Sequence, residues 1–289
     1  MKVYVLPVKP EFQPKTIPVI YPPHNKNFKD GEEVFFEYIQ KCPDLITNNP
    51  NDADWHYLPI FWTHWMVSNK FGTINIHKLQ QEVRRVIIDD KKTFTIYEYA
   101  EQPKVDIGKT IAFLGSRTSI NGFDMPLLCS RHAFLEKPKK YLASFAGSLT
   151  THPIRNKIKE KLQSMQDVLF TSGGGTEYFV NMMLESYISL CPRGYGGASY
   201  RFYEAMDLGT VPFLIGDIDH RPFKNDINWN EISFYTSDLD EIIPIISKQN
   251  KEDLISMGKK AREVYNNQLA NGNWCKYAIA TLESLEKSV

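Results

Sequence analysis

The sequence predicts an α/β protein of two doubly wound units, with ligands bound in the cleft between the carboxyl ends of their parallel strands. Two observations predict this class. Short apolar runs alternate with polar stretches of helical period along the whole chain, and residues 187–215 read as strand, glycine-rich loop, helix and strand. The 289 residues are enough for two domains. The polar segment 136–140 reads as a linker, so we expect Rossmann-like domains at 1–135 and 136–289.

In the first domain, apolar runs bounded by polar residues predict strands, and apolar residues at helical spacing predict helices. The expected strands are 3–6, 18–21, 55–61, 85–89, 93–97 and 110–114. The expected helices are 32–41, 63–69 and 76–83. Strands separated by helical segments favour a mostly parallel sheet covered by helices.

The second domain repeats this alternation. Its expected strands are 141–146, 168–170, 187–190, 211–215 and 234–236. Its expected helices are 154–165, 178–185, a short one that starts near Ser199, 239–247, 251–268 and 274–287. The last of these helices, 274–287, is a candidate for packing against the N-terminal domain.

Composition excludes several classes of function. Lys plus Arg and Asp plus Glu both number 34, so there is no global positive field to attract nucleic acid or an anionic membrane. No apolar run approaches the ~20 residues of a membrane span, and the amino terminus reads as a strand rather than a signal peptide. The four cysteines have no paired spacing, which favours reduced thiols in a cytoplasmic protein, and the seven histidines show no metal-binding spacing.

The segment 190–212 carries the strongest chemical signal. An apolar run ends in Pro192-Arg193-Gly194, passes through a glycine-rich turn, and enters a helix at Ser199-Tyr200-Arg201. Glycines let backbone N–H groups face an anion, a helix N-terminus adds partial positive charge, and arginine suits phosphate oxygens. Glu204 lies on the same helix face as Arg201 and could accept hydrogen bonds from sugar hydroxyls. Diphosphate plus hydroxyls describes a nucleotide sugar; the alternative is a surface Arg201–Glu204 ion pair beside an ordinary turn.

Two further loops follow predicted strands of the same domain. Gly147 and Ser148 form a turn after strand 141–146, and Arg155 follows in the next helix, so this loop could contribute to the same diphosphate site. Asp217 follows strand 211–215 and either contacts the sugar or caps its loop. The Gly173-Gly174-Gly175 loop lacks the Lys-Ser/Thr of a phosphate-binding loop and is better explained as a surface loop.

Transfer of a sugar to a hydroxyl with inversion needs a general base near the acceptor. Glu98, after strand 93–97, and His24, after strand 18–21, are the candidates in the first domain, and Arg193 is the candidate for stabilising the leaving group. Close rivals are Asp30, Glu32 and Glu101, and each of these five residues taken alone is better explained as a solvated charge than as the base.

These residues resemble a known family. The segments 189–194, 199–205 and 209–212 resemble the core motif of the exostosin family of glycosyltransferases. Asn51-Asp52-Ala53-Asp54 with Pro59, Asp124-Met125-Pro126, Phe145-Ala146-Gly147-Ser148 with Ile154-Arg155, and Pro222-Phe223 with Trp229 and Ser233 resemble further elements of that family, in order along the chain.

The resemblance implies a GT-B fold, two Rossmann-like domains facing a central cleft, and inverting transfer from a UDP-sugar without an essential metal or other cofactor. It places the donor diphosphate at Arg193 and Arg201 and the ribose at Glu204. The expected partners are the UDP-sugar and an oligosaccharide or glycoprotein glycan. UDP-xylose is the first expected donor, with UDP-galactose and UDP-glucuronate next.

The chain also departs from the family pattern. Family members commonly carry a membrane anchor and act in the Golgi lumen, whereas this chain is expected to be a compact, anchorless, cytoplasmic form that would suit a bacterium or a large DNA virus. The family's Asp-His pair is replaced by Lys92-Thr93. Two alternatives therefore stay open: a non-catalytic UDP-sugar or glycan-binding protein of the same fold, and a GT-B-type epimerase or phosphorylase.

Overall fold

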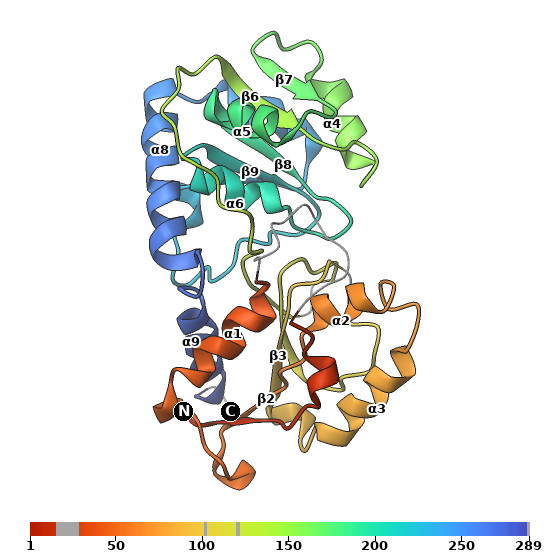
Figure 1. Ribbon diagram of the computed structural model, residues 1–289. Helices are drawn as coiled ribbons and strands as arrows, with labels where there is room; N and C mark the ends of the chain where they lie inside the picture. The colour runs from red at the N-terminus through yellow and green to blue at the C-terminus, as the bar shows by residue number, and fades with distance from the viewer. Residues whose placement is uncertain (16–28, 101–102, 120–121, 288–289) are drawn as a thin grey trace. The chain divides into compact units, whose positions relative to one another are not determined.

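The computed structural model (Figure 1) describes residues 1–15, 29–100, 103–119 and 122–287. Its contacts divide the chain into two compact units. Unit 1 comprises Met1–Leu128 and Asn271–Val289, and unit 2 comprises Cys129–Ala270. Unit 2 begins at Cys129 rather than at residue 136, and the last segment of the chain, which includes the expected helix at 274–287, is grouped with unit 1.

Unit 1 is built on a five-stranded, fully parallel sheet in the order β1-β2-β3-β4-β5. Its strands are β1 (Val3–Val5), β2 (Trp55–Tyr57), β3 (Thr93–Tyr97), β4 (Ile111–Leu114) and β5 (Phe123–Asp124). Its helices are α1 (Gly31–Gln40), α2 (Trp62–Ser68), α3 (Ile76–Val86) and α9 (Cys275–Glu286). One-turn 3-10 helices lie at Pro10–Phe12, Pro43–Leu45, Pro50–Asp52 and Asp90–Lys92. β3 is central and buried along its whole length, as its run of β-branched and aromatic residues predicts.

The prediction of a strand at 85–89 is wrong. Helix α3 continues to Val86, because Leu79, Val83 and Val86 maintain helical spacing and pack into the core of unit 1. The expected strand at 18–21 lies outside the described residues. The other expected strands and helices of this unit are present, with ends shifted by a few residues.

Unit 2 is a doubly wound α/β unit with a parallel sheet in the order β10-β9-β8-β6-β7. Its strands are β6 (Tyr141–Ala146), β7 (Val168–Thr171), β8 (Ser186–Pro192), β9 (Val211–Ile215) and β10 (Phe234–Thr236). Its helices are α4 (Ile154–Leu162), α5 (Thr176–Leu184), α6 (Tyr200–Asp207), α7 (Ile242–Ser247) and α8 (Lys251–Val264). α8 runs into a π-helical turn at Tyr265–Leu269, and 3-10 turns lie at Trp229–Glu231 and Leu239–Glu241.

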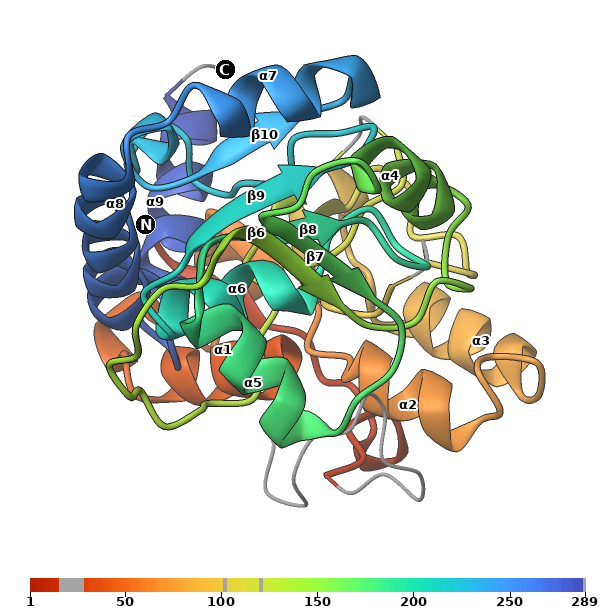
Figure 2. The same ribbon diagram turned by 90° about the horizontal axis from the view of Figure 1, so that it is seen from above.

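The two faces of the unit 2 sheet are covered by different helices, as Figure 2 shows. One face packs against α4, α7 and α8 through a large apolar core that includes Phe145, Leu190 and Phe213. On the other face, α5 and α6 pack together through Met183, Leu184, Ala205 and Leu208. Burial of both faces explains why the central strands β8 and β9 are nearly continuous apolar runs.

Two chain-wide expectations can be compared with the structure. No helix among the described residues combines the length and the apolar character needed to cross a bilayer. The four cysteines are unpaired, and three of them are buried.

Candidate functional site

The candidate site of unit 2 lies where three neighbouring strands end. Gly147 and Ser148 follow β6, Arg193 and Gly194 follow β8, and Asp217 follows β9. The strand order reverses direction between β6 and β8, because β6 pairs with both β7 and β8. In open parallel sheets, ligands bind outside the carboxyl ends of the strands at such a reversal. The topology therefore gathers the predicted donor-site loops at the edge where a ligand is expected.

Arg155, at the start of α4, ties the first two loops together. Its guanidinium donates to three carbonyl oxygens, those of Ser148 (2.8 Å), Pro192 (3.2 Å) and Arg193 (3.0 Å). Burial, with a smaller contribution from the positive charge of Arg201, lowers the pKa of Arg155 to about 10, so the guanidinium stays charged at neutral pH. Arg155 thus fixes the spacing between the β6 and β8 loops; its direct contact with phosphate stays a prediction.

Arg201, in the first turn of α6, is a buried cation between two aromatic rings. Its guanidinium carbon lies 4.4 Å from the ring centroid of Phe145 and 4.6 Å from that of Phe179. One of its nitrogens donates to the carbonyl oxygen of Ala146, the last residue of β6. A Cβ atom at position 147 would lie only 2.7 Å from Arg201 Nη2, so Gly147 lets the loop backbone approach the guanidinium.

Arg193 contacts the carboxylate of Asp217 across the β8 and β9 loops. The Arg193 side chain is 12% exposed and that of Asp217 is 60% exposed, so the pair lies at the surface of the site. The Nε atom of Arg193 is buried and makes no hydrogen bond. Burial first, and then the charge of Arg193, lowers the pKa of the adjacent His152. Arg193 therefore has an Nε–H group that is free to donate, and its partner Asp217 is exposed enough for an anion to displace it.

The start of α6 places the remaining predicted residues. Ser199 is the buried N-cap residue and Tyr200 the first helical residue, and the Ser199 side chain makes no capping hydrogen bond. Arg201 and Glu204 do not pair with each other in the way that the alternative interpretation requires. Glu204 instead contacts His132 Nε2 at 3.1 Å. Sequence reasoning missed His132, because it precedes Glu204 by 72 residues and forms no motif with it.

Charge is unevenly compensated in this site. Arg155 and Arg201 are both buried, and neither makes an ion pair with a carboxylate among the residues that the structure describes. Arg193 has one acidic partner, Asp217. A buried cation is costly unless a negative group accompanies it. The arrangement is therefore suited to an anion with several oxygen atoms, such as a diphosphate.

Unit 1 holds a separate cluster of buried acids: Asp30, Glu32 and Glu98. Glu98 accepts hydrogen bonds from the backbone N–H groups of Gly31 and Leu128, the latter at 2.6 Å. Glu32 accepts from the backbone N–H of Glu98 at 3.1 Å. Burial raises the pKa values of Glu32 and Glu98 well above the ordinary value of a glutamate, and the neighbouring negative charges, Asp30 for Glu32 and Glu32 for Glu98, raise them further.

The predicted base Glu98 therefore holds three chain segments together in this conformation, and its role as a base stays a prediction. Burial, and then the charge of Glu98, raises the pKa of Asp30 to about 7, and Asp30 Oδ2 lies 3.2 Å from His64 Nε2. His24 and Glu101 lie outside the described residues. The described residues contain no group of three or more His, Cys, Asp and Glu side chains that could hold a metal ion.

Two Rossmann-like α/β units, with an anion-suited loop cluster at the strand ends of the second, define the GT-B class of glycosyltransferase. The Exostosin GT47 domain matches residues 123–246, which include the whole candidate site of unit 2. The proposed bases His24 and Glu98 lie outside this match. This match and the relatives described next support a glycosyltransferase of the exostosin family.

Two relatives span most of the chain. It is 22% identical over 319 aligned residues to the exostosin-1 homolog of Caenorhabditis elegans, covering 92% of this chain and 80% of that protein. It is 21% identical over 293 residues to "Probable beta-1,4-xylosyltransferase IRX10" of Arabidopsis thaliana, covering 83% and 69% respectively. Among solved structures, sucrose-phosphate synthase from Thermosynechococcus elongatus aligns with a TM-score of 0.44 and 12% identity, over 94% of this chain and 87% of that one.

Proposed function

We propose that this glycosyltransferase moves a sugar from a UDP-sugar to a hydroxyl group of a glycan, with inversion at the anomeric carbon. The observation that carries the proposal is the set of three guanidinium groups at one sheet edge, of which Arg155 and Arg201 have no carboxylate partner in the described structure. A nucleoside diphosphate supplies the missing negative charge. Unit 2 is then the donor-binding unit, and unit 1 binds the acceptor, an oligosaccharide or glycoprotein glycan.

The donor diphosphate would be bound by Arg193 and by the backbone N–H groups of the Gly147-Ser148 and Gly194 loops. The N-terminus of α6, at Ser199 and Tyr200, adds partial positive charge. Arg201 acts from behind the β6 loop, because its buried charge lies against Gly147. These groups stabilise the charge that grows on the leaving diphosphate, which is commonly the largest electrostatic contribution to such a reaction.

Glu204 and Asp217 would recognise the sugars of the donor. Glu204 would accept hydrogen bonds from the ribose hydroxyls, and His132 holds its carboxylate in place. Asp217 is exposed and contacts Arg193. A phosphate oxygen can therefore replace Asp217 as the partner of Arg193, and the freed carboxylate can then accept hydrogen bonds from the transferred sugar.

In the transfer itself, the acceptor oxygen bonds to the anomeric carbon as the bond from that carbon to the β-phosphate oxygen breaks. UDP leaves with the electron pair, and a general base takes the hydroxyl proton. Glu98 and His24 are the proposed candidates for this base. We propose that no metal ion is essential, and that the enzyme acts in the cytoplasm, for which the four unpaired cysteines are the support.

The test combines UDP titration with a UDP-release assay. UDP-xylose is the first donor, since one relative is named a xylosyltransferase, and UDP-galactose and UDP-glucuronate follow. We expect saturable UDP binding and acceptor-dependent UDP release with and without a chelator. Saturable binding with no turnover on any acceptor would instead indicate a non-catalytic binding protein, and no UDP binding would refute the proposal. Turnover without an acceptor, or with free phosphate, would indicate the epimerase or phosphorylase alternative.

A further inference from the structure

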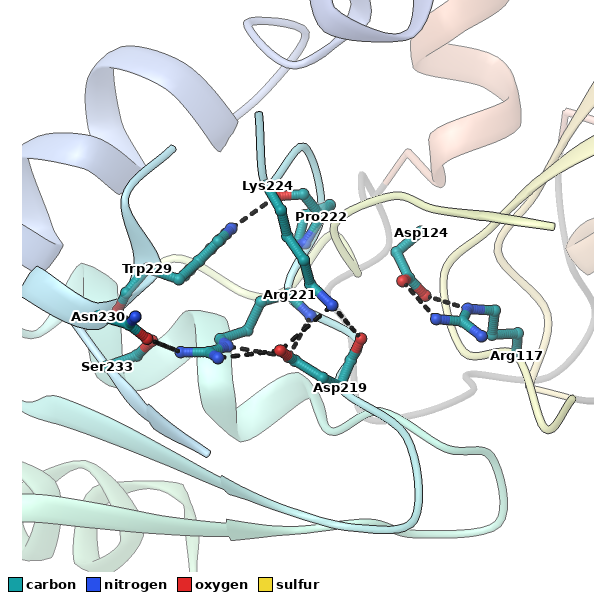
Figure 3. Close-up of polar contacts among 9 residues, drawn as sticks. All are labelled: Arg117, Asp124, Asp219, Arg221, Pro222, Lys224, Trp229, Asn230 and Ser233. Carbon is teal, nitrogen blue, oxygen red and sulfur yellow. Dashed lines mark hydrogen bonds and ion pairs between the residues drawn. The ribbon is translucent and has the colours of Figure 1, made fainter. Parts of the chain in front are cut away.

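A small pocket lies in the segment that follows β9, outside the donor-site loops. It has a volume of about 380 Å³, within the range of small-molecule sites, and its walls come from residues 221–230 of unit 2. Figure 3 shows four of the lining residues, Arg221, Lys224, Trp229 and Asn230, with the polar contacts of Arg221, Lys224 and Trp229. The proposed donor and acceptor chemistry uses none of them.

The pocket is built on a rigid frame. Arg221 is 8% exposed, and its guanidinium binds both carboxylate oxygens of Asp219, at 2.8 and 2.9 Å. It also donates to the hydroxyl of Ser233 at 3.2 Å and lies 3.5 Å from Asn230 Oδ1. Burial alone would raise the pKa of Asp219, but the hydrogen bonds and charge of Arg221, with Lys224, bring it below its ordinary value. One buried arginine thus joins the two ends of the pocket-forming loop (Figure 3).

The middle of the loop is fixed as well. The indole N–H of Trp229 donates to the carbonyl oxygen of Pro222 at 2.6 Å, and the indole is 3% exposed. Phe223 adopts a φ of +52°, which an ordinary residue keeps only where its surroundings hold it there. The pocket therefore has its shape before any ligand arrives, which lowers the entropic cost of binding.

The charges of the pocket balance within the protein. Asp219 neutralises Arg221, and it also lies 3.2 Å from the ammonium of Lys224. The two cations and the two carboxylates of Asp219 and Asp226 give a net charge of zero. This balance contrasts with the donor site, where two buried guanidinium groups lack such partners, and it removes the reason for an anion to bind here.

The groups that remain free are both donors and acceptors. The exposed amide of Asn225 and the exposed carboxylate of Asp226 make no side-chain hydrogen bond to the described residues. The amide nitrogen of Asn230 is free in the same sense, since only its oxygen is near Arg221. Closely spaced amide and carboxylate groups can donate to and accept from adjacent hydroxyls at once.

We propose that this pocket is a second saccharide-binding site, which takes a neutral saccharide of about one or two rings. The ligand's hydroxyls bind Asn225, Asp226 and Asn230, and the Arg221 frame fixes the loop that carries them. The site goes beyond the proposed transfer: it binds a glycan without the donor and without reaction.

The experiment is a titration of the full chain with neutral disaccharides, xylobiose and lactose, followed by calorimetry and by saturation-transfer NMR, with glucuronic acid as the charged comparison. We expect saturable binding of a neutral disaccharide by the unaltered protein. D226A and N225A each remove a free hydrogen-bonding group and should weaken binding at least about fivefold. D253A, which removes an exposed carboxylate on α8, is the matched control and should bind as the unaltered protein does.

Three outcomes would overturn the proposal: no saturable binding of either disaccharide, equal affinity in D226A, N225A and D253A, or a preference for glucuronic acid. Both test residues and the control residue are exposed, so all three variants are expected to fold, and melting temperatures check this. UDP titration of the same unaltered protein separates the two hypotheses. UDP binding without disaccharide binding defeats the pocket alone, whereas disaccharide binding without UDP binding defeats the proposed function alone.

Discussion

Replacing Arg201 with methionine should separate anion binding from stability. Methionine fills the space between Phe145 and Phe179 with an apolar chain and removes the buried positive charge. The change gives up two cation–π contacts of about 0.5–1 kcal/mol each and one hydrogen bond to Ala146 of about 1 kcal/mol. It also removes the desolvation cost of an unpaired buried ion, which amounts to several kcal/mol. The melting temperature of R201M should therefore equal or exceed that of the unaltered protein.

UDP binding should respond in the opposite direction. Arg201 acts on the diphosphate through its charge, and two unit charges about 6–10 Å apart interact by about 1.7–2.8 kcal/mol at an effective dielectric constant of about 20. The dissociation constant for UDP should therefore rise about 10- to 100-fold, as measured by calorimetry. R221M is the matched control for stability, because Arg221 is equally buried but paired with Asp219. R221M leaves Asp219 paired with Lys224, and this loss of its bidentate partner should cost about 2 kcal/mol and lower the melting temperature by about 4–8 °C. Unchanged UDP affinity in R201M would refute the reasoning and make Arg201 a structural residue.

Three further predictions concern other described residues. R193A should lower turnover about 100-fold or more, the size of losing one main transition-state contact, and wild-type turnover in the UDP-release assay would contradict the assignment. E204A should weaken UDP affinity by calorimetry, while unchanged affinity would remove Glu204 from ribose binding. The raised pKa of Asp30, about 7, means that the native state holds a proton that the unfolded chain has already lost above pH 4. Stability should therefore fall as pH rises from about 4 to about 7, by up to about 4 kcal/mol, and D30N should flatten this dependence in thermal melts; a melting temperature that rises across this window would contradict it.

Much of the fold could be predicted from the sequence, because the strands of unit 2 are buried on both faces. The expected strands at 141–146, 211–215 and 234–236 coincide with β6, β9 and β10. The apolar residues at 86–88 gave the wrong expectation of a strand, since the helical spacing of α3 extends to Val86. A short apolar run does not distinguish a strand from the last turn of a helix.

The candidate site could be predicted only in part. Glycines and arginines after strands marked the loops of unit 2, because the carboxyl ends of parallel strands meet at one edge. The partners of those arginines could not be predicted, since Arg155 binds carbonyl oxygens of two distant loops and Glu204 meets His132 only through tertiary packing. Burial also escaped prediction: Asp30 and Glu32 occur in a polar helix start that is typical of solvated charge, yet both are buried.

The discontinuity of unit 1 sets an order for synthesis on the ribosome. Trp274 is fully buried and its ring stacks against Phe35 of α1 at a centroid distance of 5.8 Å, so the core of unit 1 needs a residue that is translated after all of unit 2. All of unit 2 emerges between these two partners. Unit 2 can therefore form its sheet on the nascent chain first. The aromatic core of unit 1 stays incomplete until Trp274 and α9 have been synthesised.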